Sequence, residues 1–172
     1  MNGITIIRVK PKELDQLQEI GKLTFLETFS AGNTEENMRI YLEKGFSIEK
    51  LTSELYDQNS EFYFAVNGQK AIAYLKLNYG AAQTELKDPH AVEIERIYVL
   101  KAYQGKGIGP LLFDKAIKIA KTKNSDYIWL GVWEENLRAI NFYKKIGFIQ
   151  FDKHPFKFGD EEQTDIMMKL EI

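Results

Sequence analysis

Apolar runs and amphipathic stretches alternate along the whole chain, and this pattern predicts a protein that mixes strands with helices. Residues Ile4 to Val9 form a β-branched run typical of a strand. Leucine or isoleucine then recurs every three residues from Leu14 to Leu26, which is the spacing of an amphipathic helix. Two further helices are predicted to begin after Asn33 or Thr34 and after Ser47, because these side chains accept hydrogen bonds from the first N–H groups of a helix.

The rest of the chain predicts a hairpin, then a β-α-β-α unit and two closing strands. Asn67-Gly68 is expected at the hairpin turn, because both residues adopt the positive φ angles of a tight turn. The predicted elements are, in order, the strands Phe62 to Val66, Ala71 to Tyr79 and Ala91 to Val99, the helix Gly107 to about Lys121, the strand Tyr127 to Val132, the helix Asn136 to Ile146, and the strands Phe148 to Asp152 and Thr164 to Leu170. This order implies an α/β (α+β) fold with a mixed sheet and helices on both faces, in one domain over residues 1–172.

Composition excludes several classes of protein. Of the 172 residues, 23 are Lys or Arg and 25 are Asp or Glu, so the overall charge favours neither nucleic acid nor an anionic membrane. Cysteine is absent, which excludes disulfides, thiolate metal sites and a cysteine nucleophile. His90 and His154 each adjoin a proline in a predicted loop, so we expect surface histidines and no metal. With no apolar run long enough for a membrane span, a cytoplasmic monomer or homodimer is expected.

The most informative stretch is the glycine-rich turn Gln104-Gly105-Lys106-Gly107-Ile108-Gly109, between a predicted strand and a predicted helix. Alternate glycines let backbone N–H groups converge at a helix start, which favours a phosphate cradle. A plain turn without a ligand is the alternative. The stretch lacks the Ser or Thr of a Walker loop and, with Pro110 next, the third glycine of a dinucleotide fingerprint.

Two motifs together resemble the GNAT superfamily of N-acetyltransferases. Gln104-x-x-Gly107-x-Gly109 is similar to its coenzyme A motif, and the stretch from Asn136 to Phe148 is similar to its second signature. The resemblance implies a mostly antiparallel sheet of about seven strands, splayed in the middle, with acetyl-CoA as co-substrate. It also implies that the pantetheine arm pairs with backbone groups of Ile97, Tyr98 and Val99. The pyrophosphate would then meet the N–H groups of the loop residues Gln104, Gly105, Lys106, Gly107, Ile108, Gly109 and Pro110.

Further residues take roles by this resemblance. Asn136 would cap its helix, contact the coenzyme, or do both. Residues 101–123 carry six lysines and one aspartate, which suits an anionic coenzyme, although those from Lys115 on are expected to form a solvated helix face. Tyr143 matches the tyrosine that donates a proton to the departing thiolate, the alternative being an aromatic anchor. Without a cysteine nucleophile, direct transfer in a ternary complex is the simplest mechanism.

Glu93 and Glu95 are two apart on a strand, so their side chains are expected on one face, about 7 Å apart. Two carboxylates on a central strand indicate a face open to a cleft. They would attract a cationic amine and accept its proton through water. For Glu93 the alternative is a salt bridge to a lysine or to Arg96, although Arg96 is expected on the opposite face.

Within this superfamily, three stretches resemble the bacterial Pai-type spermine/spermidine acetyltransferases: Thr34 to Met38, Trp129 to Glu134, and Phe158 to Asp165. Residues 24–62 hold eight acids and three bases, which would attract a polycation. We therefore expect a primary amine acceptor, most simply a polyamine. The alternative for the acids of the first and third stretches is ordinary solvated surface; these acids are Glu35, Glu36, Asp160, Glu161 and Glu162.

Other functions stay open at this point. The chain could be a CoA-binding regulatory module without turnover, or an acetyltransferase for protein, peptide or antibiotic amines. A dinucleotide oxidoreductase is disfavoured because no acidic residue is placed to hold a ribose, and DNA binding because no arginine-rich reading helix is visible.

Overall fold

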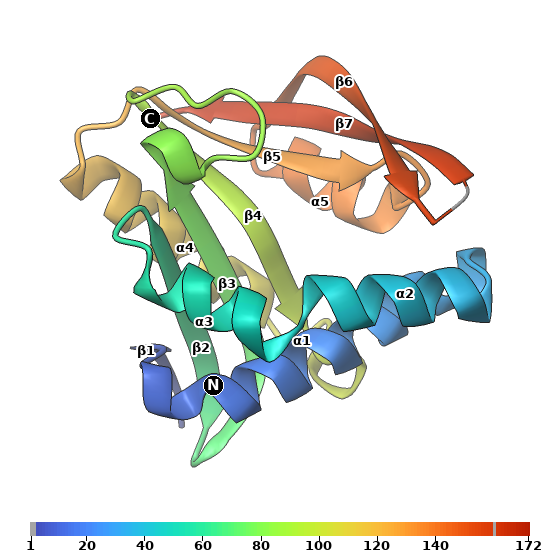
Figure 1. Ribbon diagram of the computed structural model, residues 1–172. Coiled ribbons are helices and arrows are strands. Elements are labelled where there is room, and N and C mark those ends of the chain that lie inside the picture. The colour runs from blue at the N-terminus through green and yellow to red at the C-terminus, as the bar shows by residue number, and fades with distance from the viewer. Residues whose placement is uncertain (1–2, 160) are drawn as a thin grey trace.

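One twisted seven-stranded sheet organises the computed structural model, which describes residues 3–159 and 161–172 (Figure 1). The strand order is β1-β2-β3-β4-β5-β7-β6, and among these described strands only the β4–β5 pair is parallel. The strands are β1 (Ile4–Arg8), β2 (Ser60–Asn67), β3 (Lys70–Tyr79), β4 (Ala91–Val99), β5 (Tyr127–Trp133), β6 (Ile149–Phe158) and β7 (Glu161–Glu171). The helices are α1 (Leu14–Phe29), α2 (Glu35–Gly45), α3 (Ile48–Tyr56), α4 (Ile108–Thr122) and α5 (Leu137–Lys145). The predicted fold class is confirmed.

Helices cover both faces of the sheet and enclose two separate apolar cores. In Figure 1, α1, α2 and α3 lie on the near face, while α4 and α5 lie behind. The near core joins residues of α1 and α3 to apolar residues of β2 and to Tyr74 of β3. The far core joins α4 and α5 to Ile94 of β4 and to Leu130 and Val132 of β5. No helix in the described part of the chain is long and apolar enough to cross a bilayer.

Side-chain caps start two of the helices where the sequence predicts them. The hydroxyl of Thr34 accepts a hydrogen bond from the N–H of Asn37 (3.2 Å), so Thr34, and not Asn33, is the cap of α2. The hydroxyl of Ser47 accepts one from the N–H of Lys50 (3.1 Å) at the start of α3. Each cap satisfies a backbone donor that the helix itself leaves unpaired.

The hairpin turn lies one residue later than predicted. Asn67 pairs with Lys70 across the hairpin, so the two turn residues are Gly68 and Gln69. Of these two turn residues only Gly68 has a positive φ (+62°). A two-residue turn with glycine at its first position does not need a positive φ at its second position. A register shift between Ala65 and Val66 accompanies this change.

The two closing strands are longer than predicted and form one hairpin. β6 continues past Asp152 to Phe158, although it contains Pro155, because it is the edge strand of the sheet and tolerates a proline there. His154 therefore lies in a strand, opposite Asp165 of β7, and not in a loop. Most residues of β6 are exposed and many are polar, so the pattern of apolar residues does not predict the full length of this strand.

β4 and β5 separate shortly after they meet, as the resemblance implied. They pair only at Ala91–Glu93 with Tyr127–Trp129. Beyond this point, β4 keeps its pairing with β3 and β5 keeps its pairing with β7. Beyond this point no strand of residues 3–159 and 161–172 pairs with the facing edges of β4 and β5, so the sheet is open in its middle.

The packing of α4 against the sheet can be tested with Leu112→Ala. Leu112 is fully buried in the far core, so its truncation should lower the free energy of unfolding by about 2–5 kcal/mol. Leu137→Ala is the control, because Leu137 on α5 is 65% exposed and should cost less than about 0.5 kcal/mol. Urea unfolding measures both, and equal losses would contradict the assigned core.

Candidate active site

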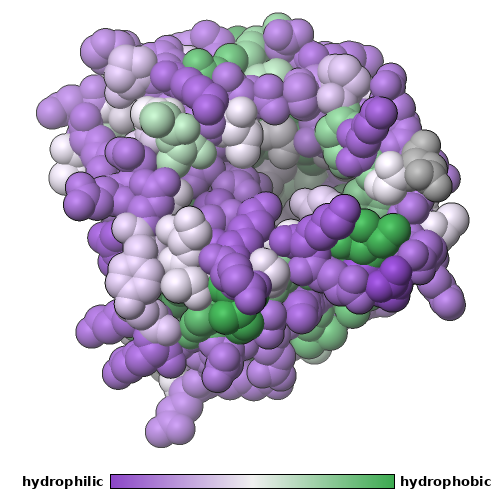
Figure 2. Space-filling model, in the orientation of Figure 1, coloured by the Kyte–Doolittle hydropathy of each residue, from purple (hydrophilic) through white to green (hydrophobic). Residues whose placement is uncertain are grey.

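A cavity of about 1080 Å³ occupies the opening between β4 and β5. Figure 2 shows a hollow in the middle of the near face, surrounded mainly by hydrophilic residues. Ten of the eleven residues predicted to hold the coenzyme line the cavity: Ile97, Tyr98, Val99, Gln104, Gly105, Gly107, Ile108, Gly109, Pro110 and Asn136. The eleventh, Lys106, is not in the lining, and its ammonium lies 5.3 Å from the ring centre of Tyr103. The structure thus brings the predicted residues together.

One edge of β4 is available to an extended ligand. Ile97, Tyr98 and Val99 pair with β3 on one side, while the other side borders the cavity. No strand of the described residues pairs with this second edge. An extended chain with amide groups could hydrogen-bond there as an added strand does.

The glycine loop has the form of an anion cradle. Gly105 and Gly107 both have φ near +75°, which favours glycine, and a Cβ at Gly105 would meet no atom within 4 Å. The side-chain amide of Gln104 fixes the loop by donating to the carbonyl of Val99 (3.0 Å), and the guanidinium of Arg138 donates to Gln104 (2.6 Å). Since Gly107 is the N-cap of α4, the positive end of that helix points into the open loop.

Lys115 on α4 and Lys123 just after its end lie outside this cradle. The ammonium of Lys115 lies 5.0 Å from the ring centre of Tyr63, and that of Lys123 lies 3.9 Å from the ring centre of Tyr79. Neither lysine lines the cavity. Both ammonium groups instead lie against tyrosine rings outside the cavity.

Tyr143 reaches the cavity from the far face of the sheet. It lies on α5, is 7% exposed, and packs against the rings of Phe142 and Phe148 at 5.4 and 5.5 Å. Burial raises the pKa of its phenol above the usual range, so the hydroxyl keeps its proton at neutral pH. Asn136 caps α5 by accepting from the N–H of Ala139 (3.2 Å), and it lines the cavity as well.

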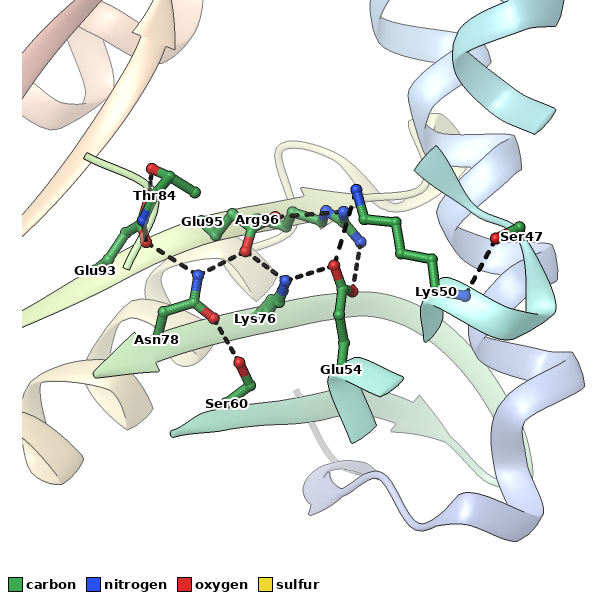
Figure 3. Close-up of polar contacts among 10 residues, drawn as sticks. All are labelled: Ser47, Lys50, Glu54, Ser60, Lys76, Asn78, Thr84, Glu93, Glu95 and Arg96. Carbon is green, nitrogen blue, oxygen red and sulfur yellow. Dashed lines mark hydrogen bonds and ion pairs between the residues drawn. The ribbon is translucent and has the colours of Figure 1, made fainter. Parts of the chain in front are cut away.

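Glu93 and Glu95 share the near face of β4 and one common donor. The amide of Asn78 donates to Glu93 (3.0 Å) and to Glu95 (2.6 Å), as Figure 3 shows. Glu93 also accepts hydrogen bonds from the backbone N–H (2.9 Å) and the hydroxyl of Thr84. Burial raises the pKa of Glu93, against the hydrogen bonds from Thr84 and Asn78, which lower it. Glu93 therefore anchors the loop before β4.

A β-bulge places Arg96 on the same face as Glu95, contrary to the sequence prediction. Lys76 of β3 pairs with Arg96, but the next residue, Leu77, pairs with Ile94. Glu95 is the extra residue of the bulge, so the simple alternation of side chains is broken there. The expectation that Arg96 points to the opposite face is wrong for this reason.

The bulge creates a buried ion network (Figure 3). Arg96 lies 3.3 Å from Glu95 and 3.5 Å from Glu54 of α3, and Lys76 contacts both carboxylates, at 2.9 Å for Glu54. Although burial opposes ionisation, the charges of Arg96 and Lys76 lower the pKa of Glu95 to about 2. The salt bridge considered for Glu93 is therefore formed by Glu95 instead, and Glu95 is a weak proton acceptor at neutral pH.

Several cavity residues were given no role in the site from the sequence, and three of them lie close together. Asp165 on β7, His154 on β6 and Glu85 in the loop before β4 all line the near side of the cavity. The imidazole of His154 lies 3.1 Å from the carboxylate of Glu85. A single aspartate beside the apolar run Ile166 to Met168 was the available signal, since a buried sheet face rarely holds an acid without a purpose.

Apart from Asp165, the described acids of the first and third Pai-like stretches lie outside the cavity. Glu35, Glu36, Glu161 and Glu162 are exposed and do not line the cavity. Glu36 pairs with Arg39 at 2.7 Å, as does Glu43 at 2.8 Å. Asp160 lies outside the described residues. These four glutamates thus fit the interpretation as solvated surface.

Comparison with known proteins agrees with this geometry. The family model described as the acetyltransferase (GNAT) family matches residues 17–148. The chain is 40% identical to an uncharacterized N-acetyltransferase of Lactobacillus delbrueckii subsp. lactis, over 98% of both chains. It is 26% identical to a spermidine N(1)-acetyltransferase of Thermoplasma acidophilum, over 97% of this chain and 96% of the relative.

A solved structure shares the fold over the whole chain. The PaiA N-acetyltransferase of Thermoplasma acidophilum, solved in complex with coenzyme A, superposes with a TM-score of 0.82 at 24% identity and covers 99% of both chains. The family match, the N-acetyltransferase relatives and the cavity with its glycine cradle lead to one conclusion. The chain belongs to the acetyltransferase (GNAT) family and is an N-acetyltransferase whose co-substrate is acetyl-CoA.

Proposed function

We propose that the protein transfers acetyl from acetyl-CoA directly to a primary amine of a polyamine, such as spermidine or spermine, or of a similar small amine. Residues 1–172 would act as one N-acetyltransferase domain. The observation that carries the proposal is the cavity through the opened sheet, with a glycine cradle at one end and carboxylates at the other. The 26% identity to a protein named spermidine N(1)-acetyltransferase supports the choice of amine.

The coenzyme would lie along the open edge of β4. The pantetheine amides would pair with backbone groups of Ile97, Tyr98 and Val99, and the pyrophosphate would accept hydrogen bonds from N–H groups of residues 104–109. Pro110 has no N–H and would contribute only to the shape of the cradle. This arrangement directs the thioester toward the point where β4 and β5 meet.

The charges and rings on the near side suit a flexible cation. Glu54 and Glu95 pair with Lys76 and Arg96, and Glu93 joins this network through the shared amide of Asn78. Three carboxylates against two cations favour a positive ligand. We propose that Glu93 and Glu95 assist amine binding through this charge. Aromatic side chains of the same cavity can cover the methylene segments and cationic groups of a polyamine; they are Phe25, Phe29, Tyr41, Trp133 and Phe158.

Tyr143 would supply the proton for the leaving group. The deprotonated amine attacks the thioester carbonyl, a C–N bond forms, and the C–S bond breaks. The phenol donates its proton to the thiolate and regains one from the nitrogen of the product, so the residue is unchanged after turnover. Because burial keeps Tyr143 protonated, it is available as an acid over the physiological pH range.

The substrate class can be tested with a panel of amines. Purified protein with acetyl-CoA should release free CoA with spermidine or spermine faster than with amino acids, aminoglycosides or peptides. Release of thiol is followed with a colorimetric reagent, and the acetylated product by mass spectrometry. Coenzyme binding without turnover on any amine would contradict the proposal and favour the regulatory module.

Tyr143→Phe tests the acid. The variant removes one hydroxyl from a well-packed aromatic cluster, so we expect kcat to fall by about a hundredfold or more while CoA affinity stays near the wild-type value. The matched control is Tyr56→Phe, because Tyr56 is 68% exposed on α3. A wild-type rate in Tyr143→Phe would assign the residue to packing alone.

The glycine cradle can be tested by comparing Gly105→Leu with Gly68→Leu. Both glycines have positive φ (+75° and +62°) and open space around a Cβ, so each substitution should cost about 1–2 kcal/mol of stability. Only Gly105 lines the cavity, so only Gly105→Leu should weaken CoA binding, by at least tenfold in calorimetric titration. Equal CoA affinities in the two variants would argue against the cradle.

A further inference from the structure

Five described residues with carboxylate side chains line the cavity, and four of them already have partners. Glu27 accepts a hydrogen bond from the backbone N–H of Lys101 (2.7 Å). Glu85 pairs with His154, while Glu93 and Glu95 belong to the network around Asn78. The fifth, Asp165, forms neither a hydrogen bond nor an ion pair with any described residue. It is therefore the carboxylate in this cavity that can receive a cation.

Asp165 lies beside the point where the sheet opens. Pairing of β4 with β5 ends at Trp129, and Gly131 is two residues further along β5 on the same face. A Cβ on Gly131 would lie only 3.3 Å from a carboxylate oxygen of Asp165. Glycine at this position thus leaves room for the carboxylate, and for a small group next to it, where the thioester would arrive.

Asp165 and Tyr143 act on opposite faces of the sheet. Trp133 is two residues after Gly131 on β5, so the two positions share one face of the sheet. The side chain of Trp133 contacts Phe29 of α1, so this shared face is the near one. Leu130 and Val132 point the other way, into the core shared with Tyr143. A thioester held between β4 and β5 would therefore have the phenol on one side and the carboxylate on the other.

The groups around Asp165 favour a proton acceptor. His154 lies opposite it on β6, Glu85 comes from the loop before β4, and Tyr41 of α2 lines the same cavity. β5 contributes no titratable group at this point. Burial raises the pKa of Asp165 to about 6, with His154 opposing and Glu85 adding to the shift. The residue is thus ionised at neutral pH and much more basic than an exposed aspartate.

We propose that Asp165 binds the protonated acceptor amine and accepts the proton that the nitrogen must lose before it attacks the thioester. This inference rests on the proposed function. The N–H bond of the ammonium breaks, its electron pair stays on nitrogen, and the proton moves to the carboxylate. The neutral acid then releases the proton to solvent, which matches the one proton that acetylation of an ammonium sets free.

Asp165→Asn tests this role, because it removes the negative charge and the proton acceptor with little change in shape. At pH 7.5 we expect kcat/KM for the best amine of the panel to fall by about a hundredfold or more, with CoA affinity within twofold of the wild type. In the wild type, kcat/KM should fall as the pH drops through about 6, since protonation disables the carboxylate. Asp165→Asn should lack this acidic limb.

Two further variants separate the alternatives. Glu171→Gln changes an exposed carboxylate on the same strand, outside the cavity, and should behave like the wild type. His154→Gln should keep the acidic limb, which excludes the neighbouring imidazole as its source. If Asp165→Asn kept the wild-type kcat/KM and its decrease at acidic pH, the proposed role of Asp165 would be wrong. A loss of CoA affinity as large as the loss of kcat/KM would contradict it as well. A wild type that acetylates no amine would instead overturn the proposed function itself.

Discussion

The parting of β4 and β5 after three paired residues is the constraint on which the rest of the molecule depends. A continuous sheet would satisfy the edges of both strands and leave no space between them. Because pairing ends at Glu93 and Trp129, β4 keeps an open edge and the two helical layers are connected through the sheet. Groups from opposite faces can then act on one bound molecule, which neither face could achieve alone.

The bulge at Glu95 adds the second requirement, a fixed arrangement of charge. It places Glu95 and Arg96 on one side of the strand, where Lys76 and Glu54 compensate them. Buried ions are tolerated when every partner is supplied, and here the partners come from β3, β4 and α3. The network holds the near face of β4 rigid and leaves Asp165, on another strand, as the carboxylate without a protein partner among the described residues.

Much of this could be predicted from local signals in the sequence. The glycines of residues 104–109, the caps Thr34 and Ser47, and the order of strands and helices all depend on residues close in the chain. What depends on pairing between distant strands could not be predicted. The bulge moves the side chain of Arg96 to the near face, but nothing in the alternation of residues along β4 indicates it. Similarly, β6 is recognisable as a strand only from its pairing with β7. The place of Asp165 in the site depends on Gly131, 34 positions earlier, because pairing of β5 with β7 brings this glycine next to the carboxylate.

A crystal structure with CoA and the acetylated amine tests the central claim most directly. The account predicts that the pantetheine arm lies against the open edge of β4, with its sulfur next to the Tyr143 hydroxyl and the nitrogen of the amine on the near face beside Asp165. Coenzyme bound outside the opening between β4 and β5, or an amine that enters from the face of α4 and α5, would contradict it.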